Sequence, residues 1–392
     1  MATHIEKVEV FCLQDPQTDF VRFEGSYQNV LVVVHGENGL YGIGESDSPP
    51  QIVKALIESP PYNHLSCGLA ALLEGEALDD PRRLWQKMYQ HTNWHGRHGV
   101  TLHAISALDI ALWDLFARTA GKPLNHYLAP EGCTGKASAG KGTGSRHQQL
   151  PAYATIYPMQ EEPEAFKAQI SPYLEQGFRR IKICVEPWWQ DTEKAIANLT
   201  ELRNYVGQDI ELMLDVAMEF TRNEQLIPFV DTLENLGFKW IEAPFELDNL
   251  ADHQRLKSST LLPIGVGDLG FTTVKEFQPY LETNAFDIAQ PDITMFGGIS
   301  ETLKLRDLIA PQGKRIIPHG YNTEITLAVN AQFLCAQPGI EPLEYSTSPS
   351  VLRQALILNP LEITSGGNVK IDTESPGLGA ELNWDLVEQC RL

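Results

Sequence analysis

The chain has 392 residues, of which 43% are hydrophobic and 21% are charged, so it holds enough apolar material for a large core. Its formal net charge of −21 argues against nucleic acid or an anionic membrane as a partner, because both attract basic surfaces. An acidic protein can still bind an acidic small molecule if a metal ion, Lys or Arg makes the charge inside the binding site positive.

The six cysteines are scattered and form no CxxC pair, which is typical of reduced thiols in a cytoplasmic protein. The first residues lack the basic and apolar regions of a signal peptide. No run approaches the ~18 apolar residues that a membrane helix needs. We therefore expect a cytoplasmic protein without a membrane span.

The first part of the chain predicts a small α+β domain over residues 1–125. Alternating runs at 8–13, 29–36 and 41–45 indicate an antiparallel meander, and the pattern becomes helical from about 50 to 122. The following segment, 126–150, is rich in Gly, Ser and Lys, which is typical of a flexible linker or surface loop.

After Pro151, short apolar runs alternate with stretches long enough for a helix. The runs are 152–157, 179–185, 210–216, 239–243, 262–267, 285–290, 315–319 and 342–346. Eight such units favour a (β/α)8 TIM-type barrel over an open sheet, and we assign it to residues 151–350. The tail, 351–392, shows no further βα unit, and we expect it to return to the N-terminal domain and complete that cap.

Ionisable residues stand at or near the ends of six successive runs, from the third to the eighth. They are Asp215, Glu242, Asp268, Asp292, His319 and Glu344. The carboxyl ends of barrel strands meet at one mouth, where TIM-barrel active sites lie. Three neighbouring carboxylates offer the hard oxygen ligands that suit Mg²⁺.

Several motifs resemble the enolase superfamily, within its mandelate racemase-like subgroup. The matching stretches are LMLDVAM, WIEAPFE, IGVGDLG, QPDITMFGG, IPHGYNTEITLA, LEYS and ALDIALWDLFARTAGKPL. The resemblance implies that Asp215, Glu242 and Asp268 bind Mg²⁺. It also implies that His319 is a base held by Asp292, and that Glu344 hydrogen-bonds the substrate carboxylate.

Two positions depart from the family pattern. Asp268 stands where the third ligand is commonly Glu, and the second strand has Lys182-Ile183-Cys184 where the subgroup often has two lysines. Lys182 remains, to neutralise the enediolate that forms when a carboxylate substrate loses its α-proton. The second lysine, which would act as a base on the opposite face of the substrate, is absent. This narrows the reaction to β-elimination of water from an acid sugar, as in the rhamnonate dehydratase-like enzymes that the chain resembles.

Two alternatives stay open from the sequence. One is a racemase, epimerase or cycloisomerase of a hydroxy acid or acid sugar, and the other is an inactive barrel with a binding role. Cys184 is either a packing residue or a thiolate that replaces the missing lysine.

The cap is expected to bind a small carboxylate substrate, through Arg22 and Tyr27 of one segment and His98 of the glycine-flanked stretch WHGRHG. The family resemblance also suggests a homo-oligomer.

Overall fold

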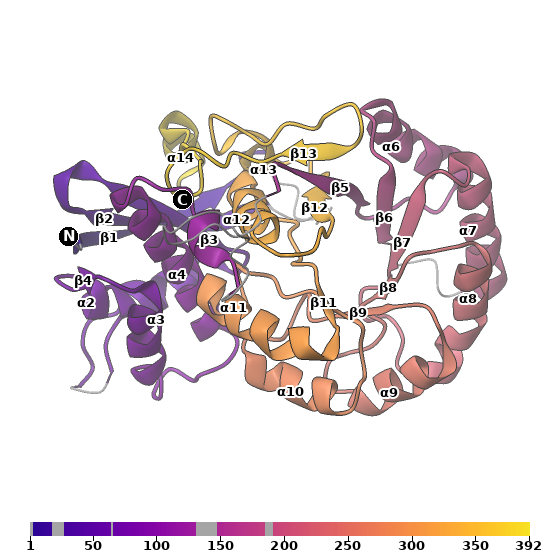
Figure 1. Ribbon diagram of the computed structural model, residues 1–392, viewed down its shortest axis with the longest axis horizontal. Helices are drawn as coiled ribbons and strands as arrows, with labels where there is room; N and C mark the ends of the chain where they lie inside the picture. The colour runs from indigo at the N-terminus through magenta and orange to yellow at the C-terminus, as the bar shows by residue number, and fades with distance from the viewer. Residues whose placement is uncertain (1–2, 18–26, 64–65, 131–146, 185–190) are drawn as a thin grey trace, which may run out of the picture.

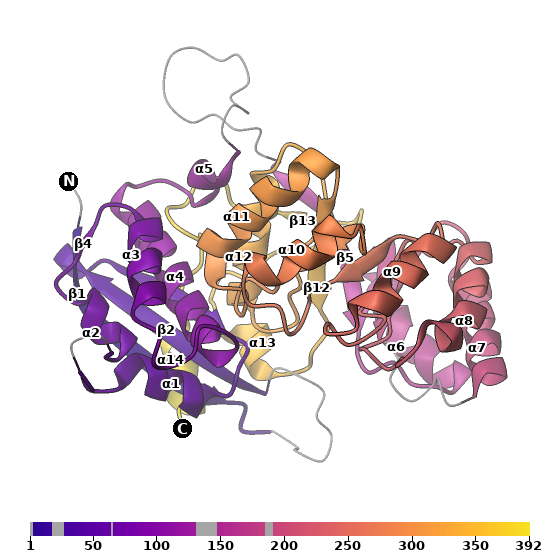
Figure 2. The same cartoon turned by 90° about the horizontal axis from the view of Figure 1, so that it is seen from below.

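The structure is a computed structural model that describes the chain except residues 1–2, 18–26, 64–65, 131–146 and 185–190. An N-terminal cap and a barrel lie side by side, and the C-terminal segment runs from the barrel back to the cap (Figure 1). The view from below shows the cap helices on one side and, on the other, the barrel helices α6 (Pro163–Glu175), α7 (Thr192–Val206), α8 (Asn223–Asn235) and α9 (Leu250–Ser259) (Figure 2).

The cap contains a four-stranded antiparallel sheet in the order β3-β2-β1-β4, which confirms the predicted meander. Its strands are β1 (Thr3–Gln14), β2 (Gln28–Gly36), β3 (Tyr41–Ser46) and β4 (Ala77–Leu78), with a 3-10 turn at Glu37–Gly39. Its helices are α1 (Pro50–Glu58), α2 (Leu69–Leu73), α3 (Pro81–Gln90), α4 (Val100–Thr119) and α5 (Asn125–Leu128).

Strand β2 is buried on both faces. Val30, Val32 and Val34 join the core of the cap helices, whereas Leu31 and Val33 join the core shared with the barrel. The strand therefore needs an apolar residue at every position from Val30 to Val34, which its sequence provides.

Helix α4 packs so closely against β3 that their backbones are in contact. A Cβ atom on Gly44 would lie 2.1 Å from the carbonyl oxygen of Ala107, so only glycine permits this approach. By length and composition α4 could also cross a membrane, but 83% of its most apolar window is buried inside the fold, as in the core helix of a soluble protein.

The second part holds the eight predicted parallel strands, and they follow one another in the order expected for a barrel. They are β5 (Gln149–Ile156), β6 (Arg180–Cys184), β7 (Glu211–Asp215), β8 (Ile241–Glu242), β9 (Ile264–Val266), β10 (Ile288–Ala289), β11 (Arg315–Ile316) and β12 (Leu343–Ser346). β12 pairs with β5, and no ladder within the described residues joins β11 to β12.

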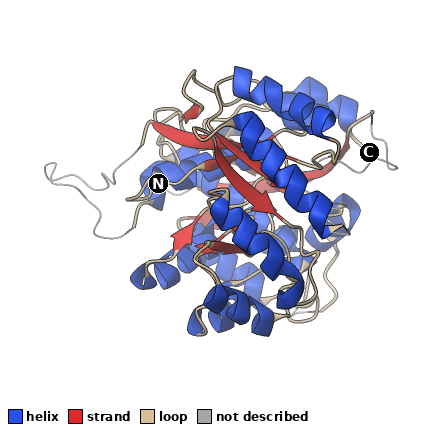
Figure 3. Ribbon diagram, turned by 90° about the vertical axis from the view of Figure 1, so that its right-hand side faces the viewer, coloured by secondary structure: helices blue, strands red, loops and turns tan. Residues whose placement is uncertain are grey.

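Helices surround these strands (Figure 3). They are α6 (Pro163–Glu175), α7 (Thr192–Val206), α8 (Asn223–Asn235), α9 (Leu250–Ser259), α10 (Val274–Glu282), α11 (Gly298–Ile309) and α12 (Glu324–Cys335), with a 3-10 turn at Ala310–Gln312. The helix that directly follows β12 is the short α13 (Val351–Ala355), so in the described part the eighth βα unit lacks a helix of barrel length.

The C-terminal tail returns to the cap, as the sequence predicted. Strand β13 (Asn368–Lys370) pairs antiparallel with β5, and α14 (Trp384–Cys390) then lies on β1. The amide of Leu392 donates to the carbonyl of Cys12 at 2.9 Å, and the rings of Trp384 and Phe11 meet edge-on at 5.9 Å. The limits of the four predicted segments stay a prediction, and most of the predicted linker lies outside the described residues.

Buried polar contacts join the cap to the barrel. Asp109 of α4 accepts hydrogen bonds from the Ser300 amide at 2.8 Å and from its hydroxyl at 2.7 Å, at the start of α11. Glu45 of β3 accepts from Thr323 at 2.6 Å and from the Thr326 amide at 2.8 Å, at the start of α12. These contacts place the loop after β3 beside the barrel mouth.

Candidate active site

Three carboxylates from neighbouring strands meet at the barrel mouth. Asp215 and Glu242 end β7 and β8, and Asp268 lies two residues beyond β9. One oxygen from each lies within 4.8 Å of the others, and all three residues are buried. This donor set, three hard oxygens at one point, fits Mg²⁺.

The charge of this group calls for a cation. Burial and the neighbouring charge of Glu242 raise the pKa of Asp215 to about 8 and that of Asp268 to about 6. A divalent cation between the three carboxylates would offset both effects.

Glu242 is held by two neutral donors. Its Oε2 accepts from Gln290 Nε2 at 2.6 Å and from Trp240 Nε1 at 3.1 Å. Gln290, which opens the QPD motif, is a residue whose role the sequence did not reveal.

The ammonium of Lys182 lies among carboxylates. Its Nζ is 2.5 Å from Glu242, 2.7 Å from Glu344 and 3.8 Å from Asp215, and the side chain is fully buried. Burial alone would lower the pKa of Lys182, but the charges of Glu242 and Glu344 raise it well above its usual value. The contacts with Glu242 and Glu344 thus favour the ammonium form of Lys182.

His319 forms the expected pair with Asp292. Its Nδ1 lies 2.9 Å from Asp292 Oδ2, while Asp292 Oδ1 accepts from the Thr294 hydroxyl at 2.6 Å and the Thr294 amide at 2.7 Å. Burial disfavours the imidazolium, but the charges of Glu344 and Asp292 and the Asp292 hydrogen bond raise the pKa of His319 to about 10. A divalent cation at the three carboxylates would lower this pKa.

Glu344 is fully buried in β12 and is satisfied within the protein. Its oxygens accept from Thr155 Oγ1 at 2.6 Å, from Lys182, and from the Gly320 amide at 3.0 Å. Burial would raise the pKa of Glu344, but the charges of Lys182 and His319 lower it to about 2. The ionised form accepts hydrogen bonds only, so the predicted bond to a substrate carboxylate would require its protonated form.

A cavity of about 370 Å³ opens at this mouth, a size suited to a small molecule. Its described lining is Asp47, Thr155, Tyr157, Lys182, Cys184, Asp215, Ala217, Met218, Asp268, Leu269, Met295, His319 and Tyr321. The structure thus brings together Lys182, His319 and two of the three predicted metal ligands around one space. Cys184, at the position of the missing lysine, also faces it.

Asp47 is a lining residue that sequence reasoning missed. Burial and the charge of Asp292 raise the pKa of its carboxyl to about 7, against the opposing effect of His319. It belongs to the cap, so no pattern within the barrel repeat pointed to it.

Sequence models of two domains match the chain. Residues 165–386 match the enolase C-terminal domain-like family, and residues 8–128 match the N-terminal domain of mandelate racemase and muconate lactonizing enzyme. The chain belongs to the enolase superfamily. This establishes the family that the motifs resemble.

Relatives within the enolase superfamily differ in reaction. The chain is 27% identical to D-galactarolactone cycloisomerase of Agrobacterium fabrum, over 93% of this chain and 91% of that one. It is 29% identical to arabinonate dehydratase of Saccharolobus solfataricus, over 79% and 77%. The fold matches a racemase from Streptomyces coelicolor, solved with bound magnesium, at a TM-score of 0.83 and 23% identity, covering 99% and 100%.

The predicted substrate-binding residues of the cap are not among the described lining of the cavity. Arg22 lies outside the described residues. Tyr27 is partly buried and its carbonyl accepts from the Asp15 amide at 2.8 Å. His98 is exposed, with Nδ1 3.3 Å from Glu276 of α10. Their role in substrate binding stays a prediction.

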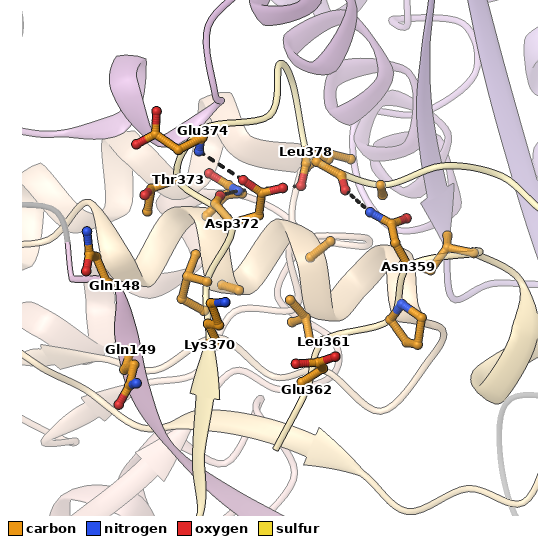
Figure 4. Close-up of a pocket in the computed structure, with 18 residues that line it drawn as sticks. Gln148, Gln149, Asn359, Leu361, Glu362, Lys370, Asp372, Thr373, Glu374 and Leu378 are labelled. Carbon is orange, nitrogen blue, oxygen red and sulfur yellow. Dashed lines mark hydrogen bonds between the residues drawn. The ribbon is translucent and has the colours of Figure 1, made fainter. Parts of the chain in front are cut away.

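A larger cavity, of about 590 Å³, lies away from the carboxylates, between α12, β13 and the C-terminal segment (Figure 4). Two of its polar side chains hydrogen-bond the backbone around them: Asp372 accepts from the amide of Glu374 at 2.9 Å, and Asn359 donates to the carbonyl of Gly379. Since these groups serve the fold, we place the active site of this enolase-superfamily protein at the smaller cavity.

Proposed function

We propose that the protein is a Mg²⁺-dependent acid-sugar dehydratase that converts a polyhydroxy carboxylate to a 2-keto-3-deoxy acid. The observation that supports this reaction best is the asymmetry of the site. It offers a base in the His319–Asp292 pair, whereas Lys182 is held as a cation by Glu242 and Glu344.

We assign the metal to Asp215, Glu242 and Asp268, whose clustered oxygens fit a divalent cation. When bound, Mg²⁺ would supply a Lewis acid that stabilises negative charge on the substrate carboxylate. The magnesium in the Streptomyces coelicolor racemase agrees with this assignment.

The residues of this chain account for the proton movements. Neutral His319 takes the α-proton through Nε2 while Asp292 stabilises the imidazolium, and the C–H electron pair moves toward the carboxylate to give an enediolate. The Lys182 ammonium offsets the new charge. The enediolate then expels the β-hydroxyl, which leaves as water with the proton returned by His319, and the resulting enol tautomerises to the 2-keto acid.

A second candidate is isomerisation by a racemase, epimerase or cycloisomerase. The relative in Agrobacterium fabrum, a cycloisomerase, supports it, and Cys184 and Tyr321 line the cavity where another proton donor or acceptor would be needed. An inactive barrel is less well supported, because buried charges that serve no reaction would only destabilise the fold.

The test is incubation of the Mg²⁺-loaded protein with a library of aldonates and aldarates, read as 2-keto acid formation. We expect at least one substrate whose conversion stops in EDTA and returns with Mg²⁺. Isomerisation without 2-keto acid would favour the second candidate. The cytoplasmic location and the homo-oligomer stay predictions.

A further inference from the structure

Asp47 holds a fixed place at the edge of the candidate active site. Its amide donates to Thr294 Oγ1 at 3.2 Å, and the hydroxyl of Ser48 lies 2.9 Å from His103 Nδ1 in α4. Two residues earlier, Glu45 is anchored to Thr323 and Thr326. The loop is therefore attached on both sides of Asp47, so the backbone of Asp47 has a defined position.

Asp47 lines the cavity, and its carboxylate lies within reach of the charges of Asp292 and His319. The structure records no hydrogen bond to this carboxylate from a described residue. A cavity-lining carboxylate without a donor is suited to accept hydrogen bonds from substrate hydroxyl groups.

No lysine or arginine among the described lining residues is free to pair with a second carboxylate. Among the described lining residues, Lys182 is the single lysine or arginine, and it contacts Glu242 and Glu344. A divalent cation at the carboxylate cluster, together with Lys182, would bind the first carboxylate of a substrate. A second carboxylate near Asp47 would meet like charge, which recognition sites use to exclude wrong ligands.

We propose that Asp47 is a specificity-determining residue that binds a hydroxyl of the substrate tail and excludes a second carboxylate, so that the substrate is an aldonate rather than an aldarate. This inference rests on the proposed acid-sugar chemistry. The barrel supplies the groups assigned to the reaction, and the cap supplies the residue that faces the rest of the substrate.

The experiment measures binding with turnover removed. In a His319→Asn background with Mg²⁺ at pH 8, calorimetry compares paired sugars that differ only at the terminal carbon, such as galactonate and galactarate. In the pair whose aldonate has the highest affinity, we expect the aldonate to bind at least about tenfold more tightly than the matching aldarate. Asp47→Asn should weaken aldonate binding about tenfold and strengthen aldarate binding, because the amide keeps the size but removes the charge.

Ser48→Ala is the matched control, since it loosens the loop without changing the charge of the cavity. It should change both affinities in the same direction and by less than about threefold. Tighter aldarate binding before mutation, or an equal effect of Asp47→Asn on both sugars, would overturn the inference. Aldonate binding without 2-keto acid formation by the parent protein would instead contradict the proposed dehydration and leave the role of Asp47 supported; no binding of any sugar would overturn both.

Discussion

Thr294 connects the cap to the proposed base, and its hydroxyl can be removed with little change of shape. The hydroxyl accepts from the Asp47 amide and donates to Asp292 Oδ1 at 2.6 Å, and the other oxygen of Asp292 holds His319. Thr294→Val deletes a hydrogen bond to a charged acceptor, which contributes about 1.5–3 kcal/mol. If this bond fixes Asp292 for catalysis, kcat should fall about 10- to 100-fold.

The pH profile separates this positioning role from a general loss of structure. With one donor fewer, Asp292 retains more negative charge toward the imidazole, so the pKa of His319 should rise further. The limb of the kcat/KM profile that reports His319 should then move to higher pH. Thr294→Ser keeps the hydroxyl and should retain kcat within about threefold, with an unshifted profile.

The assay follows α-proton exchange in D₂O or dehydration of an identified substrate, with circular dichroism melting as a check on folding. Thr294→Val with the kcat and pH profile of the parent protein would refute the reasoning that Thr294 positions the His319–Asp292 pair.

Two further predictions concern the metal and the cap. Asp268→Asn removes a proposed ligand and should weaken Mg²⁺ binding, measured by calorimetry, at least about 100-fold. Asp372→Asn in the larger cavity is the control and should leave the affinity for Mg²⁺ unchanged. If Asp268→Asn binds Mg²⁺ as tightly as the parent protein, the metal lies elsewhere. Burial raises the pKa of Asp109 from its usual 3.8 to about 7, so between these two pH values the folded state binds a proton that the unfolded state has lost. The free energy of unfolding should therefore fall as the pH rises from about 4 to about 7, by about 4 kcal/mol at most. Asp109→Asn should flatten this dependence in urea unfolding followed from pH 4 to pH 8, and parallel profiles would show that Asp109 is not its source.

Much of the barrel was predictable because its pattern repeats along the chain. Each short apolar run became a strand, and parallel strands put their carboxyl ends at one mouth, so Asp215, Glu242 and Asp268 were expected to meet. The end of the barrel was also predictable, because the tail after β12 shows no further βα pattern in the sequence. The pairing of β13 with β5 on the way to the cap was not predicted, because three residues of an edge strand leave no distinct pattern.

The residues that were missed depend on contacts between distant segments. Asp47 reaches the cavity only because α4 docks on α11 and β3 docks on α12, which no local pattern encodes. Thr294 lies inside the quoted QPDITMFGG motif, but its role follows from the direction of its hydroxyl. His98 was predicted to bind substrate, which stays a prediction; its Nδ1 lies 3.3 Å from Glu276 of α10, a contact that the packing of the cap on the barrel creates.

The most direct test of the central claim is the activity of His319→Asn on a substrate that the parent protein dehydrates. Asparagine keeps a polar side chain but cannot take the α-proton, so we predict that both 2-keto acid formation and α-proton exchange in D₂O fall at least about 1,000-fold, with Mg²⁺ still bound. Dehydration at a rate near that of the parent protein would contradict the assignment of His319 as the base.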